Sequence, residues 1–528
     1  MKAALLRVGL FVLYCIVLSA CTSESTSLND IVVGEIATDL NPYGRVPLGA
    51  KLNFRTKEAC RVTLTVAGEE PLTRKYTQFK KSHSLNVIGL YPGRENTLEL
   101  TLTTPKGTTY VGEIKLSAPA IPDNFPRIEV TTLEREAMEP GFHVADLLLA
   151  NDGKFLSYTV LFDDMGTIRW YMDMSENGQI TYTPYRLKNG NWLYLDWTTL
   201  LEVDELGQTV SKQQMYGNAG NHEIVELYDG RLLMTGSKKD TYVERDGERI
   251  ATRFDHVVLW DRAANQTAQD WDLRKVLDVD RSVFPADYNL DPRADWLHVN
   301  SVALDQVNQA LLVSGRNQGV VKIDLQNQLK WILAPHVGWG KAGYKGQGLE
   351  TSQYLLTAVD ENGQAYPASI QRGKVSAPDF DWPQGQHGLN ILPNGNLLLF
   401  DNGLYRHFEK PQQYSRAVEY AIDEKAKTIR QVWQYGKERG LAMSSPITSD
   451  VDVLPTTGNR LITCGNIRQT DEPGHAKLVE VTYPDNRVVF EADLFFEDAK
   501  GNQQPSWGQL DLVFRGERYP IFHTPKTK

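Results

Sequence analysis

The chain has 528 residues and a formal net charge of −10, and 41% of its residues are hydrophobic. That hydrophobic content is enough to build a folded core, so the chain is not intrinsically disordered. Its basic residues are scattered without a Lys- or Arg-rich block, which excludes a typical nucleic-acid-binding surface. Abundant glycine (41), tyrosine (23) and tryptophan (11) favour β structure, because strands prefer aromatic residues and tight turns need glycine.

The first twenty residues have the pattern of a secretory signal. Lys2 and Arg7 precede the apolar run GLFVLYCIVLSA, which is too short for a comfortable membrane span. The run leads into LSAC, which resembles the bacterial lipobox, and Cys21 is the cysteine that would carry the lipid. We therefore expect a lipoprotein signal peptide over residues 1–20 and a polar tether over residues 21–27. The expected location is the bacterial cell envelope, lipid-anchored and facing the periplasm, in the outer membrane because no aspartate follows Cys21.

Residues 28–118 predict a small N-terminal β-sandwich domain. Short alternating stretches such as CRVTLTVAG and NTLELTLTT are separated by the turn sequences YPGREN and TPKGT. The proline-rich residues 119–127 then predict a linker.

Residues 128–528 contain a repeat of two apolar strands joined by a turn. The six copies are LLLANDGKFLSYTV, YRLKNGNWLYLDW, VELYDGRLLMTGS, VALDQVNQALLVSG, NILPNGNLLLFDNG and DVLPTTGNRLITCGN. Six such units over about four hundred residues are typical of a six-bladed β-propeller. A parallel β-helix is the alternative, but its repeats are shorter and more regular. The predicted fold class is all-β, a six-bladed β-propeller preceded by the sandwich domain.

Three histidines share one position of this repeat. His222, His298 and His387 lie five or six residues before the same leucine of their hairpins. His143 has a similar spacing but less polar surroundings, and we interpret it as structural. Equivalent positions on different blades converge on the propeller axis, so the three histidines are predicted to meet in one pocket. Convergent histidines indicate acid–base, nucleophilic or metal chemistry.

Two polar residues accompany His298 in the sequence. Asn300 lies two residues further on, and so on the same face of a strand. Arg316 ends the next strand, where its planar fork suits a bound oxyanion, although a surface ion pair explains it equally well.

Longer motifs around these residues carry a family resemblance. The stretches DWLHVNSV, GQHGLNILPNGNLLLFDNG, YSRAVEYAID and SDVDVLPTTGNRLITCGN resemble the bacterial arylsulfate sulfotransferase family. The resemblance implies transfer of a sulfuryl group from a phenolic sulfate to another phenol, without the nucleotide donor PAPS or any other cofactor. It implies a ping-pong mechanism in which His387, in the sequence QHG, is the nucleophile and forms a sulfohistidine.

The same resemblance assigns roles to further residues. The catalytic set would be His387, His222, His298 and Arg316, with Asn300 and Thr448 binding substrate. The expected partners are aryl sulfates, phenols and, through the lipid, a membrane; a homodimer is left open, and no nucleic acid or metal is expected.

Two other functions were weighed. Three histidines with an open fourth position would suit zinc in a metal-dependent hydrolase, although no HExxH motif is present. A lipid-anchored propeller could instead be a non-enzymatic binding module, but such a scaffold has no need of histidines in one register.

Overall fold

The computed structural model describes residues 26–151, 154–177, 182–282, 294–408, 414–467, 474–496 and 511–523. The signal segment and Cys21, and with them the predicted lipid site, lie outside these ranges. Within them the chain is built almost wholly of strands, and its two α-helices are single turns, α1 (Leu28–Ile31) and α2 (Ala368–Gln371). The all-β class is confirmed. No helix in the described ranges has the length and apolar character that a membrane crossing requires.

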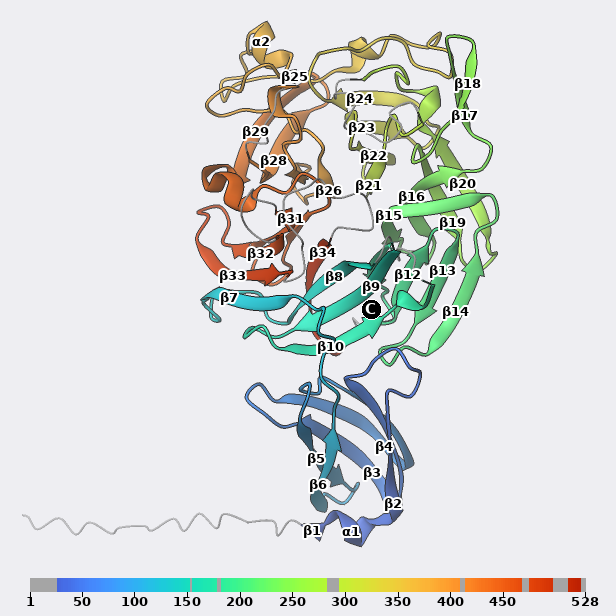
Figure 1. The fold of residues 1–528 in the computed structure, drawn as a ribbon, viewed down its shortest axis with the longest axis vertical. Helices are drawn as coiled ribbons and strands as arrows, with labels where there is room; N and C mark the ends of the chain where they lie inside the picture. Colours follow the sequence, from blue (N-terminus) through green and yellow to red (C-terminus); the bar gives the residue numbers. More distant parts are fainter. Residues whose placement is uncertain are drawn as a thin grey trace, which may run out of the picture. The chain divides into compact units, whose positions relative to one another are not determined.

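The described chain divides into two compact units, of which the first comprises residues 26–37, 53–84 and 97–115. Its strands belong to one hydrogen-bonded sheet in the order β1-β6-β5-β3-β2, with β4 also paired to β3 (Figure 1). The strands are β1 (Thr26–Ser27), β2 (Val32–Leu40), β3 (Gly49–Val66), β4 (Leu72–Ile88), β5 (Glu95–Thr103) and β6 (Thr109–Ser117). Val62 and Leu64 of β3 lie opposite Leu102 and Leu100 of β5, and all four are buried. Alternation along each strand thus places one apolar face in the core.

The second unit contains six large sheets in the described ranges, antiparallel except where β25 pairs with β29 in parallel. In order from one edge, the first three are β10 (Ile168–Asp173), β9 (Lys154–Phe162), β8 (Phe142–Asn151) and β34 (Leu512–Tyr519); β11 (Tyr182–Arg186), β12 (Trp192–Asp196), β13 (Thr199–Val203) and β14 (Thr209–Gln214); and β15 (Asn218–Glu226), β16 (Leu232–Lys238), β19 (His256–Asp261) and β20 (Gln266–Asp272). A separate hairpin pairs β17 (Tyr242–Arg245) with β18 (Glu248–Ala251).

The other three sheets follow along the chain. They are β21 (Val299–Asp305), β22 (Ala310–Gly315), β23 (Gly319–Asp324) and β24 (Leu329–Leu333); β26 (His387–Ile391), β27 (Leu397–Asp401), β28 (Arg416–Asp423), β29 (Thr428–Tyr435) and β25 (Thr357–Ala358); and β30 (Asp450–Val453), β31 (Arg460–Ile467), β32 (His475–Val481), β33 (Val488–Phe495) and β7 (Arg127–Leu133). Short 3₁₀ turns occur at Ser175–Asn177, Leu273–Lys275, Thr351–Tyr354, Arg406–Phe408 and Lys437–Met443.

The six sheets share one central cavity. It has a volume of about 420 Å³, and its walls come from β11, β15, β21, β26, β30 and β34, one strand from each sheet. The sheets are arranged about it as the blades of a propeller (Figure 1). Apolar side chains fill the space between neighbouring sheets, as where Val313 of β22 packs in one cluster with Leu259 of β19. The framework is therefore rigid around the cavity.

The sheet that holds both β8 and β34 departs from the repeat in the sequence. Five of the sequence copies supply the two innermost strands of a sheet, but the first copy supplies β8 and β9, the second and third strands. The innermost strand is β34, from the end of the chain. His143 on β8 is therefore one strand away from the cavity, stacked on Phe490 at 3.8 Å between ring centroids.

Candidate active site

The strands that carry the candidate residues are irregular at the candidate positions. The pairing of β15 shifts between Asn221 and Ile224, and that of β26 shifts between His387 and Asn390. His222 and His298 have φ angles of 45° and 55°, in the left-handed region that side chains other than glycine rarely adopt. Bulges of this kind turn a side chain away from the regular strand direction, and strained backbone of this kind gathers at functional sites.

His222 and His298 are joined directly. Their Nε2 atoms lie 3.0 Å apart, so the two rings share one hydrogen bond. The Nδ1 of His298 donates to Oδ2 of Asp295 at 2.6 Å. Because a carboxylate only accepts, the three side chains form a continuous chain of hydrogen bonds.

His387 lies beside this pair, with its ring centroid 6.4 Å from that of His222 and nearly perpendicular to it. Its Nδ1 is 2.7 Å from Oδ1 of Asn402 and 3.0 Å from the carbonyl of Gly385. The amide nitrogen of Asn402 already donates to the carbonyls of Ser445 and Thr448, at 2.7 and 3.0 Å. The amide oxygen must then face His387, so Nδ1 carries the proton and Nε2 carries the lone pair.

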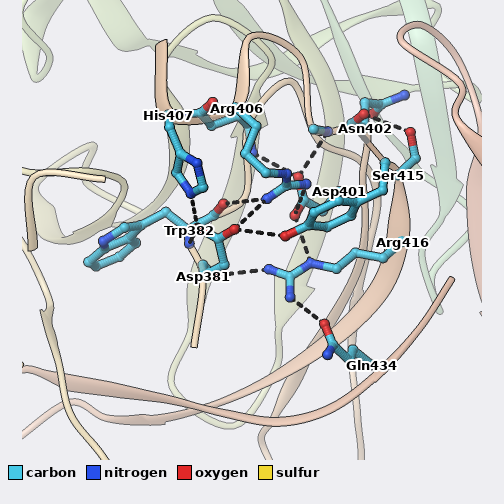
Figure 2. Close-up of polar contacts among 12 residues, drawn as sticks. Asp381, Trp382, Asp401, Asn402, Arg406, His407, Ser415, Arg416 and Gln434 are labelled. Carbon is cyan, nitrogen blue, oxygen red and sulfur yellow. Dashed lines mark hydrogen bonds and ion pairs between the residues drawn. The ribbon is translucent and has the colours of Figure 1, made fainter. Parts of the chain in front are cut away.

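A buried ionic network holds the two segments that meet at His387 (Figure 2). Oδ1 of Asp401 accepts from the backbone N–H groups of Gln384 and Gly403, at 2.9 and 3.0 Å. Its Oδ2 accepts from Arg406 and Arg416, both at 2.9 Å. The loop before His387 and the turn after Asn402 are thus fixed to one carboxylate, which keeps the contact between His387 and Asn402 in register.

Burial and one cation determine the protonation of the three rings. Burial lowers the pKa of His387 to about 3 and holds the pKa of His222 well below its ordinary value. It also lowers the pKa of His298, against which Asp295 acts in the opposite direction. The guanidinium of Arg316 contributes to the lowering at every one of the three rings, which places it among them. At neutral pH the histidines are uncharged.

Asn300 and Thr448 form hydrogen bonds with the backbone and side chains that hold His387 in place. Nδ2 of Asn300 donates to the carbonyl of Gln386 at 2.7 Å and so holds the residue before His387. The carbonyl of Thr448 holds Asn402, and its hydroxyl donates to the carbonyl of Val513 at 3.2 Å. Thr448 has a φ of 56°, an unfavourable conformation for a β-branched residue. In the structure both residues contact the segments that position His387.

An aromatic wall flanks the histidine pair. Phe514 of β34 stacks on His222 with ring centroids 5.1 Å apart, and Phe254 meets His298 edge-on at 5.2 Å. Trp197 stacks on Phe254 and is 36% exposed, so an aromatic surface leads from the solvent to the rings. Such a surface suits a flat apolar group.

The central cavity is lined by the residues that follow His222 and His387 in the chain, not by the histidine rings themselves, and it has an acidic part. Asp450, Asp452 and Glu517 each offer an oxygen within 4.8 Å of the others, and they form the one group of three potential metal ligands among the residues described. The ligand atoms of His222, His298 and His387 do not converge within that distance, so the geometry does not favour the zinc site considered above. Burial raises the pKa of Asp452 well above its usual range and that of Glu517 to about 7.

Three side chains that contact the candidate histidines were not identified in the sequence. Asp295 opens the motif DWLHVNSV, three residues before His298, where a carboxylate beside a histidine was a usable signal. Asn402 lies in the turn FDNG, whose composition indicates only a turn. Phe514 comes from the last strand, outside every copy of the repeat.

Comparison with known proteins identifies the family of the chain. A family model described as arylsulfotransferase (ASST) matches residues 128–503, and one described as the arylsulfotransferase Ig-like domain matches residues 37–119. The chain therefore belongs to the arylsulfotransferase family, a family of sulfotransferase enzymes.

Two curated relatives are both named arylsulfate sulfotransferase AssT. The protein from Escherichia coli O6:H1 is 31% identical over 395 residues, which cover 66% of this chain and 64% of that protein. The protein from Lelliottia amnigena is 28% identical over 560 residues, covering 89% and 91%. Among solved structures, dihydro-heme d1 dehydrogenase NirN is 11% identical with a TM-score of 0.28, over 83% of this chain and 73% of that one. That likeness is too remote to bear on function.

Proposed function

We propose that the chain transfers a sulfuryl group from a phenolic sulfate ester to a phenolic acceptor, without PAPS, through a sulfohistidine on His387. The observation that carries the proposal is the hydrogen bond from Nδ1 of His387 to Asn402. It leaves the lone pair on Nε2, and burial keeps the ring neutral, so Nε2 is prepared as a nucleophile. Family membership supports the reaction class.

In the donor half-reaction Nε2 of His387 forms a bond to sulfur. The bond from sulfur to the aryl oxygen breaks, and its electron pair leaves with the phenolate. The pair of His222 and His298, which first takes up one proton from solvent, gives that proton to the phenolate. Arg316 stabilises the negative charge that gathers on the sulfuryl oxygens, with its two parallel donors.

The acceptor half-reaction reverses these steps. The new phenol gives its proton to the same pair, and its oxygen attacks sulfur. The bond from Nε2 to sulfur breaks, and its electrons return to His387. The free enzyme is regenerated with its proton, so no cofactor is consumed, and ping-pong kinetics follow.

Mass spectrometry of the enzyme mixed with an activated aryl sulfate tests the intermediate. We expect one SO₃ group on the peptide containing His387, and its loss when a phenol is added. An adduct on another residue, or turnover without any adduct, would contradict the assignment. A stoichiometric, tightly held transition metal in the purified enzyme would favour the hydrolase instead.

We also propose that the enzyme is anchored in the bacterial cell envelope by a lipid on Cys21 and faces the periplasm. The support is the signal-like segment and the LSAC sequence. Metabolic labelling with a radioactive fatty acid, compared with Cys21→Ser, tests this; equal labelling of both would refute it.

A further inference from the structure

His298, one of the two histidines beside His387, differs from it in what faces its Nδ1 atom. Nδ1 of His298 faces the carboxylate of Asp295 at 2.6 Å, whereas Nδ1 of His387 faces the neutral amide of Asn402 at 2.7 Å. The distances are nearly equal, so the difference lies in charge. A carboxylate favours a protonated ring through both its charge and its hydrogen bond, whereas a neutral amide does so through the hydrogen bond alone.

We propose that Asp295 is a positioning residue that joins His298 and His222 into one proton relay, with the substrate's proton entering and leaving at His222. The proposal rests on the proposed function, because it assigns the acid–base part of that reaction.

The resting arrangement follows from the hydrogen bonds. Nδ1 of His298 gives its proton to Asp295, so its Nε2 accepts the bond from Nε2 of His222. When the acceptor phenol loses its proton to Nδ1 of His222, the Nε2 proton of His222 moves to His298. One bond to hydrogen forms and one breaks at each ring, and the positive charge comes to rest on His298 against Asp295. The donor half-reaction runs the same shifts backwards, starting from a pair that has taken one proton from solvent, and the acceptor half-reaction returns that proton.

Asp295 is needed because the cations beside the pair oppose its protonation. Arg316 and Arg253 face His298, and Arg316, Arg515 and the ring of His387 face His222. Asp295 is the charge that favours a proton on His298. Burial would raise the pKa of Asp295, but His298 and Arg316 lower it, so the carboxylate stays ionised.

The position of Asp295 is well defined by its neighbours. It is 3% exposed, and its backbone carbonyl accepts from Nδ2 of Asn317 at 2.8 Å. The next residue, Trp296, is buried and donates through Nε1 to Asp255 at 3.2 Å. The carboxylate therefore cannot turn away from His298 without disturbing the loop that carries both.

The test is Asp295→Asn, assayed with two donors, one whose phenol leaves readily and one whose phenol is a poor leaving group. A poor leaving group depends on protonation, so we expect its donor half-reaction to slow by about a hundredfold and that of the activated donor by much less. The basic limb of the pH profile should also move to lower pH, because the pair then loses its proton more easily. Asp295→Glu should restore part of the rate with the poor donor.

Two controls keep the result interpretable. Asp452→Asn removes a carboxylate from the acidic part of the cavity and should leave both donors and the pH profile unchanged. If Asp295→Asn does not fold, His222→Gln should show the same selectivity between donors.

The two proposals fail differently. If the wild-type enzyme forms no adduct on His387, the nucleophile assignment is wrong. If the wild type forms the adduct but Asp295→Asn, or His222→Gln in its place, slows both donors equally, the relay is overturned. An unchanged pH profile in the folded Asp295→Asn variant would overturn it as well.

Discussion

The histidine site and the acidic part of the cavity are adjacent in sequence but opposite in chemistry. Glu223 follows His222, and Asp450 lies two residues after Thr448. Arg515 of β34 joins these acids, with both Nη atoms 2.9 Å from Glu223 and its Nε 2.8 Å from Asp450. Neutral rings therefore occupy one side of this pairing and carboxyl groups of raised pKa the other.

This difference shows how one set of strands can hold two environments. Bulges in β15 and β26 fall at the histidines, and the alternation along a strand sends the next residue in another direction. Arg515 then satisfies Glu223 and Asp450, which would otherwise repel one another. We infer that the histidine site performs the chemistry, and each prediction below tests that division.

The largest expected effect is the loss of the nucleophile. His387→Asn keeps a polar side chain of similar size but has no ring nitrogen to attack sulfur. We expect turnover to fall by at least about a thousandfold, measured as release of the donor phenol. Glu517→Gln, in the acidic part, is the matched control and should retain turnover. Equal losses in the two variants would show that the cavity acts as one site.

Arg316→Lys separates charge from geometry at the histidine site. Lysine keeps the positive charge but loses the planar fork that gives two parallel hydrogen bonds. We expect kcat/KM for the donor to fall by about a hundredfold, with the fall mainly in kcat, because the contacts strengthen as charge develops on the sulfuryl oxygens. A variant that kept wild-type kcat would show that Arg316 serves only as a structural ion pair.

The acidic part should affect stability rather than turnover. Glu517 has a pKa of about 7 in the folded chain, above its unfolded value. Between pH 4.3 and 7 the folded state therefore binds more protons than the unfolded state, and stability falls as the pH rises. Glu517→Gln should raise the free energy of unfolding at pH 8 by up to about 3 kcal/mol and leave it unchanged at pH 4. Urea titrations at the two pH values measure this.

At the histidine site, stability should change with pH in the opposite direction. The pKa of His387 is lowered to about 3, so between pH 3 and 6.5 the unfolded state binds the extra proton. Stability then falls as the pH drops below 6.5, by about 2 kcal/mol at pH 5 for one such ring. His387→Asn should lose about this share of the acid sensitivity in the same urea titrations, while His222 and His298, whose pKa values are also lowered, keep theirs. A wild-type slope in that variant would mean that the ring is charged in the fold.

The sequence predicted the architecture and the histidines for one physical reason. A strand-turn-strand repeat defines equivalent positions, and rotation about a common axis brings equivalent positions together. His222, His298 and His387 could be found in this way. Asn402 and Phe514 could not, because a turn asparagine and a strand phenylalanine have ordinary structural roles in nearly every β protein.

The role of Asn300 also required the structure. The sequence placed it on the same face as His298, which suggested a donor to substrate. In the structure its Nδ2 donates to the carbonyl of Gln386, 86 positions away and directly before strand β26 of the neighbouring sheet. Contacts between blades depend on which side chains meet across the packed interface, and no spacing within one repeat encodes them.

The smallest effect expected on turnover is that of Asn402→Ala. The carbonyl of Gly385 still accepts from Nδ1 of His387, so the preferred tautomer survives with one partner instead of two. We expect the donor half-reaction to slow by about tenfold at unchanged KM, because the ring loses one of the two hydrogen bonds that orient it. Stopped-flow release of the donor phenol measures it.

The control for Asn402→Ala lies in the same sheet, in the turn between β26 and β27. Asn396→Ala removes an amide that donates to Glu419 at 2.6 Å, far along the strand from His387. Both variants should lose stability, because each leaves a buried acceptor without its donor, at about 1–3 kcal/mol. Only Asn402→Ala should slow the donor half-reaction. If the two slowed it equally, the effect would come from the stability of the sheet, and the Asn402 amide would have no particular part in preparing His387.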